Sequence, residues 1–178
     1  MTDLMIIVGP TGAGKSTQAD YLVAQHSGWV HLSSGDLLRR DPEMAKALTN
    51  GQLASNEEVD RVVNDALEAH RDAEMIVLDG FPRTVEQIPW LETAIKRFNL
   101  KLRAVVKLDI TKEEAARRLA LRHRADDNVP SIAAKWDWYE HKTLPLVAHF
   151  DEQGLVLTCN GDDSVEDIGN IIDEAIRV

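Results

Sequence analysis

Five short apolar runs recur along the chain. They cover residues 4–8, 29–32, 75–79, 104–108 and 155–158. Each run is too short for a typical helix and almost continuous in its apolar character, as in strands that are buried on both faces of a parallel sheet. The longer segments between them, such as 57–69, 85–98 and 165–176, carry apolar residues at helical spacing. The pattern predicts a single α/β domain in which helices cover both faces of a five-stranded parallel sheet, a three-layer α/β/α fold.

Several helix ends carry recognisable signals. Ser34 or Asp36 is expected to cap the helix that follows the second apolar run, since either side chain can accept a hydrogen bond from a free backbone N–H. Thr111, with Glu114 three residues later, has the pattern of a capping box. A long helical pattern precedes the last apolar run, and Pro145 within it is expected to produce a kink or a junction.

Composition and charge limit the partners of the chain. Its 178 residues include 20 Lys and Arg against 30 Asp and Glu, which gives a formal net charge of −10. An acidic surface argues against nucleic acid or an anionic membrane as the partner, so a small anionic ligand would need a locally positive pocket. Cys159 is the single cysteine, which excludes an intramolecular disulfide and a cysteine-rich metal site. Without a signal peptide or an apolar run long enough to span a bilayer, we expect a cytoplasmic protein, and we expect a monomer.

Residues 9–16, Gly-Pro-Thr-Gly-Ala-Gly-Lys-Ser, match the phosphate-binding pattern G-x-x-x-x-G-K-[ST] at every fixed position. Glycines let the chain turn tightly, so that backbone N–H groups can surround phosphate oxygens. Lys15 supplies a positive charge for the outer phosphates, and the Ser16 hydroxyl suits Mg²⁺. An apolar run precedes the motif and a helical pattern follows it. This context favours a nucleotide site and a fold of the P-loop NTPase type over the alternative, a glycine-rich turn that binds nothing.

Other candidate residues follow the ends of the predicted strands. Asp79 ends the third apolar run, where an aspartate can orient Mg²⁺ and its water ligands. The alternative role of Asp79 is to cap the segment that follows it. Ligands of parallel α/β sheets lie at the carboxyl ends of the strands. The segments expected to converge at this edge are therefore the phosphate-binding loop, residues 34–39 and 79–83, the basic stretch after Leu121 and the turn at 159–161.

Four segments carry a family resemblance. They are Gly-Ala-Gly-Lys-Ser-Thr-Gln at 12–18, Ser-Ser-Gly-Asp-Leu-Leu-Arg at 33–39, Asp-Gly-Phe-Pro-Arg-Thr at 79–84 with Gln87, and Arg-Ala-Asp-Asp-Asn at 124–128. Over nearly its whole length the chain resembles the adenylate kinase family of nucleoside monophosphate kinases. The resemblance implies reversible phosphoryl transfer from MgATP to AMP, which gives two ADP. It also implies a core of residues 1–32, 63–116 and 128–178 with two mobile covers, a monophosphate-binding segment at 33–62 and a very short lid at 117–127.

The resemblance further implies roles for single residues. The ATP site would comprise Gly12, Ala13, Gly14, Lys15, Ser16, Thr17, Arg118, Arg122 and Asp163. The AMP site would comprise Ser34, Arg39, Gln52, Leu53, Ala54, Gly80, Phe81, Pro82, Arg83, Gln87, Arg124 and Lys135. Catalysis would depend on Lys15, Arg83, Arg122, Arg124 and Lys135, and Mg²⁺ would be bound by Ser16 and Asp79, partly through water. Arg118 would lie over the adenine of ATP, and Gln87 would face the base of AMP.

The chemistry of phosphoryl transfer supports this assignment. Two anions must be held in line with their charge neutralised, and guanidinium groups from separate segments suit that task because they fork onto phosphate oxygens and keep their charge. The alternative is that the arginines of 117–124 form a solvated helix face. The chain departs from the family pattern in its short lid, which has no cysteine and for which no zinc is expected, and in Lys135, which replaces an arginine. We therefore expect activity, with slower turnover or weaker exclusion of water.

Other functions are compatible with parts of the sequence. A UMP/CMP kinase would share the chemistry, although the Gln87 amide can both donate to and accept from adenine. A nucleotide-binding regulator with little transfer activity would explain the short lid and Lys135. A kinase for a small non-nucleotide acceptor is a further alternative, which residues 79–84 disfavour. Gln87 also has an alternative role as a solvated helix residue.

Overall fold

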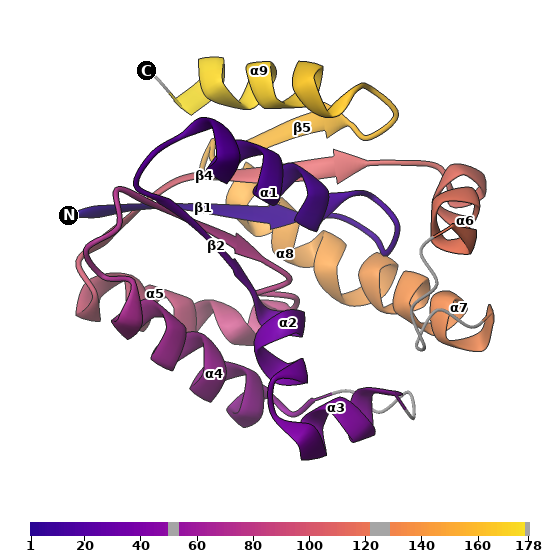
Figure 1. Ribbon diagram of the computed structural model, residues 1–178, viewed down its shortest axis with the longest axis horizontal. Helices are drawn as coiled ribbons and strands as arrows, with labels where there is room; N and C mark the ends of the chain where they lie inside the picture. Colours follow the sequence, from indigo (N-terminus) through magenta and orange to yellow (C-terminus); the bar gives the residue numbers. More distant parts are fainter. Residues whose placement is uncertain (50–53, 122–128, 177–178) are drawn as a thin grey trace.

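The sheet is built as the apolar runs predict. The computed structural model describes residues 1–49, 54–121 and 129–176. These residues form five strands in the order β2-β3-β1-β4-β5, and each neighbouring pair is parallel. The strands are β1 Thr2–Val8, β2 Trp29–Ser33, β3 Met75–Asp79, β4 Leu100–Asp109 and β5 Val156–Asn160. Their carboxyl ends point to the same edge, beyond which α6 (Lys112–Ala120) and α7 (Val129–Trp138) lie (Figure 1).

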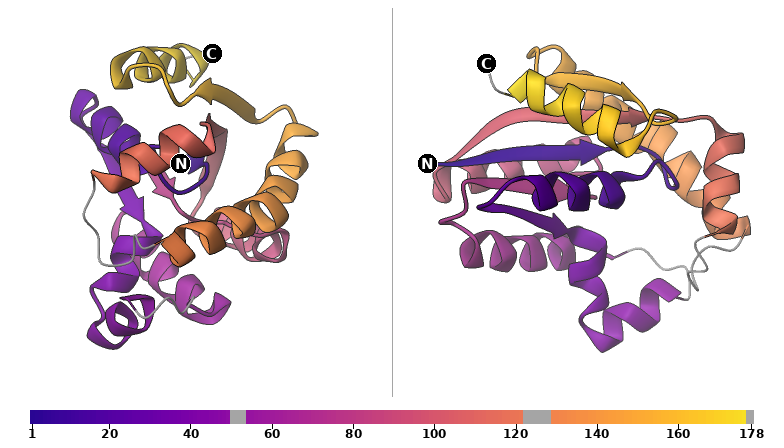
Figure 2. Two further views of the ribbon diagram at one scale, coloured as in Figure 1. Left: turned by 90° about the vertical axis from the view of Figure 1, so that its right-hand side faces the viewer. Right: turned by 45° about the horizontal axis from the view of Figure 1, so that its top comes forward.

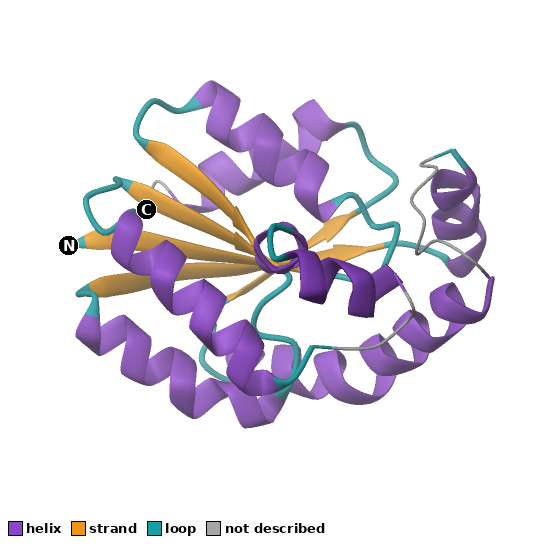
Figure 3. Cartoon of the chain, turned by 60° about the horizontal axis from the view of Figure 1, so that its bottom comes forward, coloured by secondary structure: helices purple, strands orange, loops and turns teal. Residues whose placement is uncertain are grey.

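Helices cover both faces of the sheet and give the predicted three layers. The other helices are α1 Lys15–Gln25, α2 Ser34–Arg39, α3 Pro42–Thr49, α4 Asn56–Ala69, α5 Ile88–Arg97, α8 Leu144–Asp151 and α9 Val165–Ile176, with a 3₁₀ turn η1 at Val85–Gln87. One face packs against α1 and α9, and the other against α4, α5 and α8 (Figures 2 and 3). The strands are apolar throughout because both of their faces are buried.

The central strand shows how one apolar run serves two cores. Leu4, Ile6 and Val8 pack on the side of α4, α5 and α8. Met5 and Ile7, which alternate with them, pack on the side of α1 and α9. All five side chains are buried, so the run at 4–8 contains no polar residue that would mark a solvent-exposed face of the strand.

Strand β4 is longer than the predicted 104–108. The apolar pattern missed its first half because that half contains charged residues. It begins at Leu100, and the register with β1 shifts at Arg103. The Arg103 guanidinium donates to the carbonyl oxygen of Ile176 at 3.0 Å and lies 3.5 Å from a carboxylate oxygen of Asp3. These polar partners let a charged side chain enter a strand, which an apolar pattern cannot predict.

Neither of the residues predicted to cap the second helix, Ser34 and Asp36, is its N-cap. Ser33 is the N-cap of α2, and its hydroxyl accepts a hydrogen bond from the backbone N–H of Asp36 at 3.3 Å. Ser34 is already helical, and its hydroxyl donates to the carbonyl oxygen of Gly80 at 2.7 Å. The Ser34 side chain, predicted to cap the helix, therefore makes a tertiary hydrogen bond instead.

The cap predicted for α6 is confirmed in part. The Thr111 hydroxyl accepts from the backbone N–H of Glu114 at 3.2 Å. The Glu114 carboxylate accepts instead from the guanidinium groups of Arg117 and Arg118, at 2.6 and 2.7 Å. Two arginines on the same helix provide better partners for this carboxylate than the backbone of its own cap.

The long helical pattern before the last strand is interrupted, as Pro145 predicts. Helix α7 leads into a π-helical turn at Tyr139–Thr143, and α8 then begins at Leu144. Pro145 lies in the first turn of α8, where its missing backbone N–H costs least. Among the described residues, no helix combines the length and the apolar character that crossing a bilayer would require.

Candidate functional site

The loop between β1 and α1 has the backbone that the phosphate-binding motif requires. Gly12 and Gly14 adopt positive φ values of 87° and 90°, a region that favours glycine. A Cβ atom at Gly12 would lie 2.9 Å from the carbonyl oxygen of Ala115 on α6. Ala13 between them is buried, and Thr17 lies in the first turn of α1. The loop is thus held tightly between the sheet edge and α6, with the amino end of α1 directed at it.

Lys15, the first residue of α1, folds its side chain back over this loop. Its Nζ atom donates to the carbonyl oxygens of Gly9 and Pro10, each at 2.9 Å. These contacts hold the ammonium group across the loop and close to Asp79, whose pKa it helps to lower. The positive charge therefore lies where the outer phosphates of a nucleotide in this loop would be.

Ser16 and Asp79 meet, as the resemblance implies. The Ser16 hydroxyl donates to Oδ2 of Asp79 at 2.6 Å, and only 4% of Asp79 is exposed. Burial alone would raise the pKa of Asp79, but the neighbouring His31, the charge of Lys15 and the hydrogen bond from Ser16 lower it below its usual value. A hydroxyl beside an ionised carboxylate is an oxygen donor set that suits Mg²⁺. Among the described residues, no three His, Cys, Asp or Glu side chains gather closely enough to hold a metal ion by themselves.

Behind Asp79 lies a histidine that the sequence analysis did not identify. Nδ1 of His31 lies 2.7 Å from Oδ1 of Asp20, and Nε2 lies 3.8 Å from Oδ2 of Asp79, which is beyond hydrogen-bond range. Burial would lower the pKa of His31, but the two carboxylates raise it above its ordinary value. Asp20 follows Ser16 by one helical turn, a spacing that places both side chains on the same side of α1. That spacing places Asp20 near Ser16, but it carries no signal for the contact with His31.

A second group of cations forms where β3 ends and α2 begins. The Ser34 hydroxyl and Nε of Arg83 both donate to the carbonyl oxygen of Gly80, at 2.7 and 2.6 Å. Arg39 extends from the last turn of α2, and its Nη2 donates to Asp36 at 2.6 Å.

The charges of Arg83 and Arg39 influence each other. Burial lowers the pKa of Arg83, Asp79 opposes this change, and the charge of Arg39 lowers the pKa further. Solvent still reaches the Arg83 side chain, and an arginine guanidinium keeps its charge at neutral pH. Two like charges this close form a site that a phosphate group would stabilise.

Gln87 is not the solvated residue of the alternative interpretation. Only 6% of it is exposed, and its side chain is held at both ends. The backbone N–H of Arg83 donates to Oε1 at 2.7 Å, and Nε2 donates to Oδ1 of Asn56 at 2.9 Å. Phe81 and Pro82, also predicted for the AMP site, are buried beside this segment, and Ala54 lies two residues before Asn56.

Arg118 lies beside the phosphate-binding loop, whereas its neighbour Arg117 does not. One guanidinium nitrogen of Arg118 is 3.9 Å from the position a Cβ would take at Gly14, and another is 3.6 Å from Asp162. The Arg117 side chain is 65% exposed and paired with Glu114. The arginine pattern at 117–124 is therefore not one uniform solvated face, at least where the structure describes it.

The remaining predicted residues divide into two groups. Asp163 lies in the turn after β5, at the same sheet edge, and Oδ1 of its carboxylate accepts from Asn160 at 2.8 Å. Lys135 lies in α7 and is partly buried. Gln52, Leu53, Arg122 and Arg124 lie outside the described residues.

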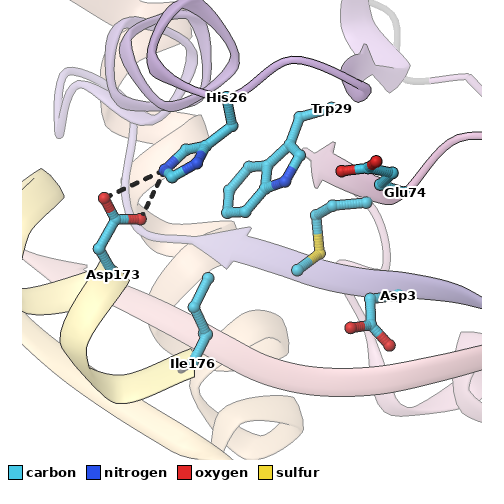
Figure 4. Close-up of a pocket in the computed structure, with 7 residues that line it drawn as sticks. Asp3, His26, Trp29, Glu74, Asp173 and Ile176 are labelled. Carbon is cyan, nitrogen blue, oxygen red and sulfur yellow. Dashed lines mark hydrogen bonds and ion pairs between the residues drawn. The ribbon is translucent and has the colours of Figure 1, made fainter. Parts of the chain in front are cut away.

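A separate hollow lies at the opposite edge of the sheet. Its volume is about 420 Å³, and it is lined by Asp3, His26, Trp29, Glu74, Met75, Asp173 and Ile176. His26 stacks on Trp29 and pairs with Asp173 at 2.9 and 3.1 Å (Figure 4). Asp3, Trp29 and Met75 lie at the amino ends of β1, β2 and β3, so this hollow is not part of the site built around the phosphate-binding loop.

Comparison with known proteins finds relatives along almost the whole chain. The adenylate kinase family model matches residues 7–155. An adenylate kinase of Prochlorococcus marinus (strain MIT 9303) is 36% identical over 184 aligned residues, which cover 99% of this chain and 100% of that protein. An adenylate kinase of Synechococcus sp. (strain RCC307) is 33% identical with the same coverage. One from Leptospira biflexa is 36% identical over 97% of this chain and 98% of that protein. The chain belongs to the adenylate kinase family, as its four sequence segments predict.

Proposed function

We propose that the chain catalyses reversible phosphoryl transfer from MgATP to AMP, forming two ADP. One observation supports this proposal most directly: two consecutive residues at the end of β3 contact the two cationic groups of the site, the one at the phosphate-binding loop and the one at Arg83. Asp79 contacts Ser16 on the phosphate-binding loop, and the carbonyl oxygen of Gly80 accepts from Ser34 and Arg83. Phosphates bound by the two groups would lie end to end, which is the arrangement that transfer requires.

In this reaction an oxygen of the AMP phosphate attacks the terminal phosphorus of ATP, and the bond from that phosphorus to the bridging oxygen of ADP breaks. The loop amides and Lys15 hold the ATP phosphates, while Arg39 and Arg83 hold the AMP phosphate. We assign the remaining charge neutralisation to Arg122, Arg124 and Lys135. When bound, Mg²⁺ supplies further charge neutralisation, and Ser16 and Asp79 are the residues that would hold it, partly through water.

We further propose that the core consists of residues 1–32, 63–116 and 128–178, with the segments 33–62 and 117–127 as covers. Covers that close over the nucleotides would keep water from the reacting phosphate. The short lid and the lysine at 135 are expected to weaken that exclusion, so some hydrolysis of ATP should accompany transfer. The monomeric state and the cytoplasmic location remain predictions.

A single assay of ADP formation tests the proposal. The full chain is incubated with MgATP and, in separate reactions, with AMP, CMP or UMP. We expect AMP to be the best acceptor and Lys15→Met to abolish transfer, because methionine removes the charge at similar size. Lys96→Met is the matched control, since Lys96 is exposed in the last turn of α5, and it should keep full activity.

Each other outcome has a defined meaning. If kcat/KM were tenfold higher for CMP or UMP than for AMP, the assignment of AMP as the preferred acceptor would be wrong. Tight binding of ATP and AMP without any ADP, even at high enzyme concentration, would instead indicate a nucleotide-binding regulator. The presence of Lys15, Asp79, Arg39, Arg83, Arg122 and Arg124 together argues against that function, because binding alone does not require charges arranged to neutralise a phosphoryl group in transfer.

A further inference from the structure

We propose that Thr143 is a positioning residue for the monophosphate site: its hydroxyl holds the backbone of Arg83 and thereby fixes where the Arg83 guanidinium group lies. The Thr143 hydroxyl donates to the carbonyl oxygen of Arg83 at 2.9 Å, and the two residues are 60 positions apart in the chain. A carbonyl oxygen can only accept, so the hydroxyl must be the donor. This inference rests on the proposed function, in which Arg83 binds the phosphate of AMP.

The hydrogen bond lies in a part of the structure that excludes water. Thr143 is buried, and so is Thr84, which shares the peptide group of the Arg83 carbonyl. If the hydroxyl were removed, water could not readily take its place, and the carbonyl oxygen would be left without a donor from this side. The backbone at Arg83 would then shift toward another donor, and the side chain would shift with it.

Thr143 does what the other contacts of Arg83 do not. The backbone N–H of Arg83 donates to Gln87 at 2.7 Å, and its Nε donates to the carbonyl oxygen of Gly80 at 2.6 Å. Both partners lie within four residues of Arg83, so these two contacts give the segment its local shape. Neither of them ties Arg83 to another helix. The Thr143 hydroxyl does, since it comes from the helical segment of α7 and α8, and α8 also packs against η1.

Thr143 ends the π-helical turn between α7 and α8. The backbone N–H of Leu144 donates to the carbonyl oxygen of Tyr139, five residues earlier, where a regular α-helix would span four. Pro145 accounts for the place of this turn, because it has no N–H to offer the carbonyl oxygen of His141, four residues before it. Turns of this kind are rare, and many of them lie at functional sites.

The π-helical turn also brings Thr143 into line with Lys135, which follows the same side of the site in the proposed function. Thr143 follows Lys135 by eight residues. In an uninterrupted α-helix that spacing would turn the two side chains about 80° apart. One additional residue in the turn takes up about 100° of rotation, so the two side chains leave the segment within about 20° of each other. By holding Arg83, Thr143 therefore sets the position of this arginine relative to the helix that carries Lys135.

The test compares two substitutions that differ in one property. Thr143→Val keeps the shape of the side chain and removes the hydroxyl, whereas Thr143→Ser keeps the hydroxyl. kcat and KM are measured for AMP and for MgATP with the full chain. We expect Thr143→Val to raise KM for AMP about tenfold and to leave KM for ATP unchanged, because the phosphate-binding loop is not affected. Thr143→Ser should keep KM for AMP close to that of the wild type.

Thr93→Val is the matched control. The Thr93 hydroxyl also donates to a carbonyl oxygen, at 2.8 Å, but its partner is Pro89 within the same helix α5. This variant should leave both KM values unchanged. A double-mutant cycle then tests whether Thr143 acts through Arg83. Arg83→Ala keeps the backbone carbonyl and removes the guanidinium group, so adding Thr143→Val to it should not weaken AMP binding further, as measured by calorimetry.

Several outcomes would overturn the inference. It is wrong if Thr143→Val keeps the wild-type KM for AMP, if Thr143→Ser raises KM as much, if KM for both nucleotides rises together, or if the full effect persists with Arg83→Ala. If Thr143→Val shows no cooperative melting transition, Thr143→Ala removes the same donor and takes its place, and failure of both to fold would make Thr143 purely structural. Should the wild-type chain form no ADP, the proposed function fails, and the dissociation constants for AMP in the same variants test the inference.

Discussion

At the scale of single residues, the ionised state of Asp79 connects the fold to the chemistry. Its carboxylate lies in a buried position that would favour the protonated form, and Lys15, His31 and Ser16 together keep its pKa low. The charge is thus maintained by neighbours from α1 and β2, not by solvent. Because the fold keeps Asp79 ionised in a buried position, we expect its charge to contribute to activity. A neutral side chain of the same shape at this position tests that expectation.

Asp79→Asn preserves the shape of the side chain and removes its charge. We expect the rate of ADP formation to fall by about a hundredfold to a thousandfold and the Mg²⁺ concentration for half-maximal activity to rise. The measurement is a Mg²⁺ titration of ADP formation. Asp72→Asn, at an exposed position before β3, is the control and should behave as wild type. Unchanged activity and Mg²⁺ requirement in Asp79→Asn would remove Asp79 from the mechanism.

Cys159, on β5, provides a test of the core beneath the same sheet edge. Only 2% of the residue is exposed, and burial, followed by the charge of Asp163, raises the pKa of its thiol. Below that raised pKa the thiol stays protonated, so the reactive thiolate is scarcer than in an unfolded chain near pH 8.5. We expect a chromogenic disulfide reagent to react with the folded protein far more slowly than with protein in denaturant. Equal rates would mean that β5 is open to solvent.

At the scale of elements, the contact between α1 and α9 depends on a glycine. Gly169 faces the ring of Tyr21, and a Cβ atom at residue 169 would overlap that ring, with Cδ1 at 2.9 Å. Since α1 begins at the phosphate-binding loop, its packing against α9 supports the position of Lys15 and Ser16. A small residue at this crossing lets the two helices approach closely.

Gly169→Ala should therefore destabilise the protein although alanine favours helix. Overpacking costs about 1–3 kcal/mol, and the gain in helix propensity is about 1 kcal/mol, so a net loss of about 1 kcal/mol in the free energy of unfolding is expected. Denaturant unfolding measures it, with Asn170→Ala, at the exposed neighbouring position, as the control. If the Gly169→Ala loss persists undiminished in a Tyr21→Ala background, overlap with the ring is not its cause.

The elements themselves could be predicted largely because burial on both faces leaves an unbroken apolar signal. This holds for β1 and β3, whose residues are almost all buried. It fails at the first half of β4, where Arg103 finds polar partners on other elements. It also fails at the start of α2, since the choice between Ser33 and Ser34 as the cap depends on Gly80, which is remote in sequence.

The same distinction applies to the site. The convergence of Lys15, Ser16 and Asp79 could be predicted because each lies at or just beyond the end of a strand, and parallel strands bring those ends together. The contacts of Gln87 with Asn56 and of His31 with Asp20 could not, because they depend on how particular helices pack against the sheet. Sequence pattern predicts which edge carries the chemistry, whereas tertiary packing determines which neighbours orient the groups there.

At the scale of the whole molecule, an acidic protein has to concentrate its cations to bind anions. The formal net charge is −10, yet Lys15, Arg39, Arg83 and Arg118 all lie at the carboxyl edge of the sheet. Without nucleotides, Arg39 and Arg83 repel each other, and bound phosphate would relieve that repulsion. Binding energy from the two nucleotides should therefore stabilise the folded state as a whole.

This coupling can be measured as a shift in melting temperature. A ligand at about a hundred times its dissociation constant adds about 2.7 kcal/mol, which for a domain of this size corresponds to roughly 5–10 °C. We expect MgATP and AMP each to raise the melting temperature of the full chain by such an amount. In Lys15→Met the shift with MgATP should largely disappear while the shift with AMP persists, because Lys15 serves one nucleotide and Arg39 and Arg83 serve the other. Loss of both shifts in that variant would indicate a damaged fold, and retention of the full MgATP shift would show that Lys15 does not bind ATP.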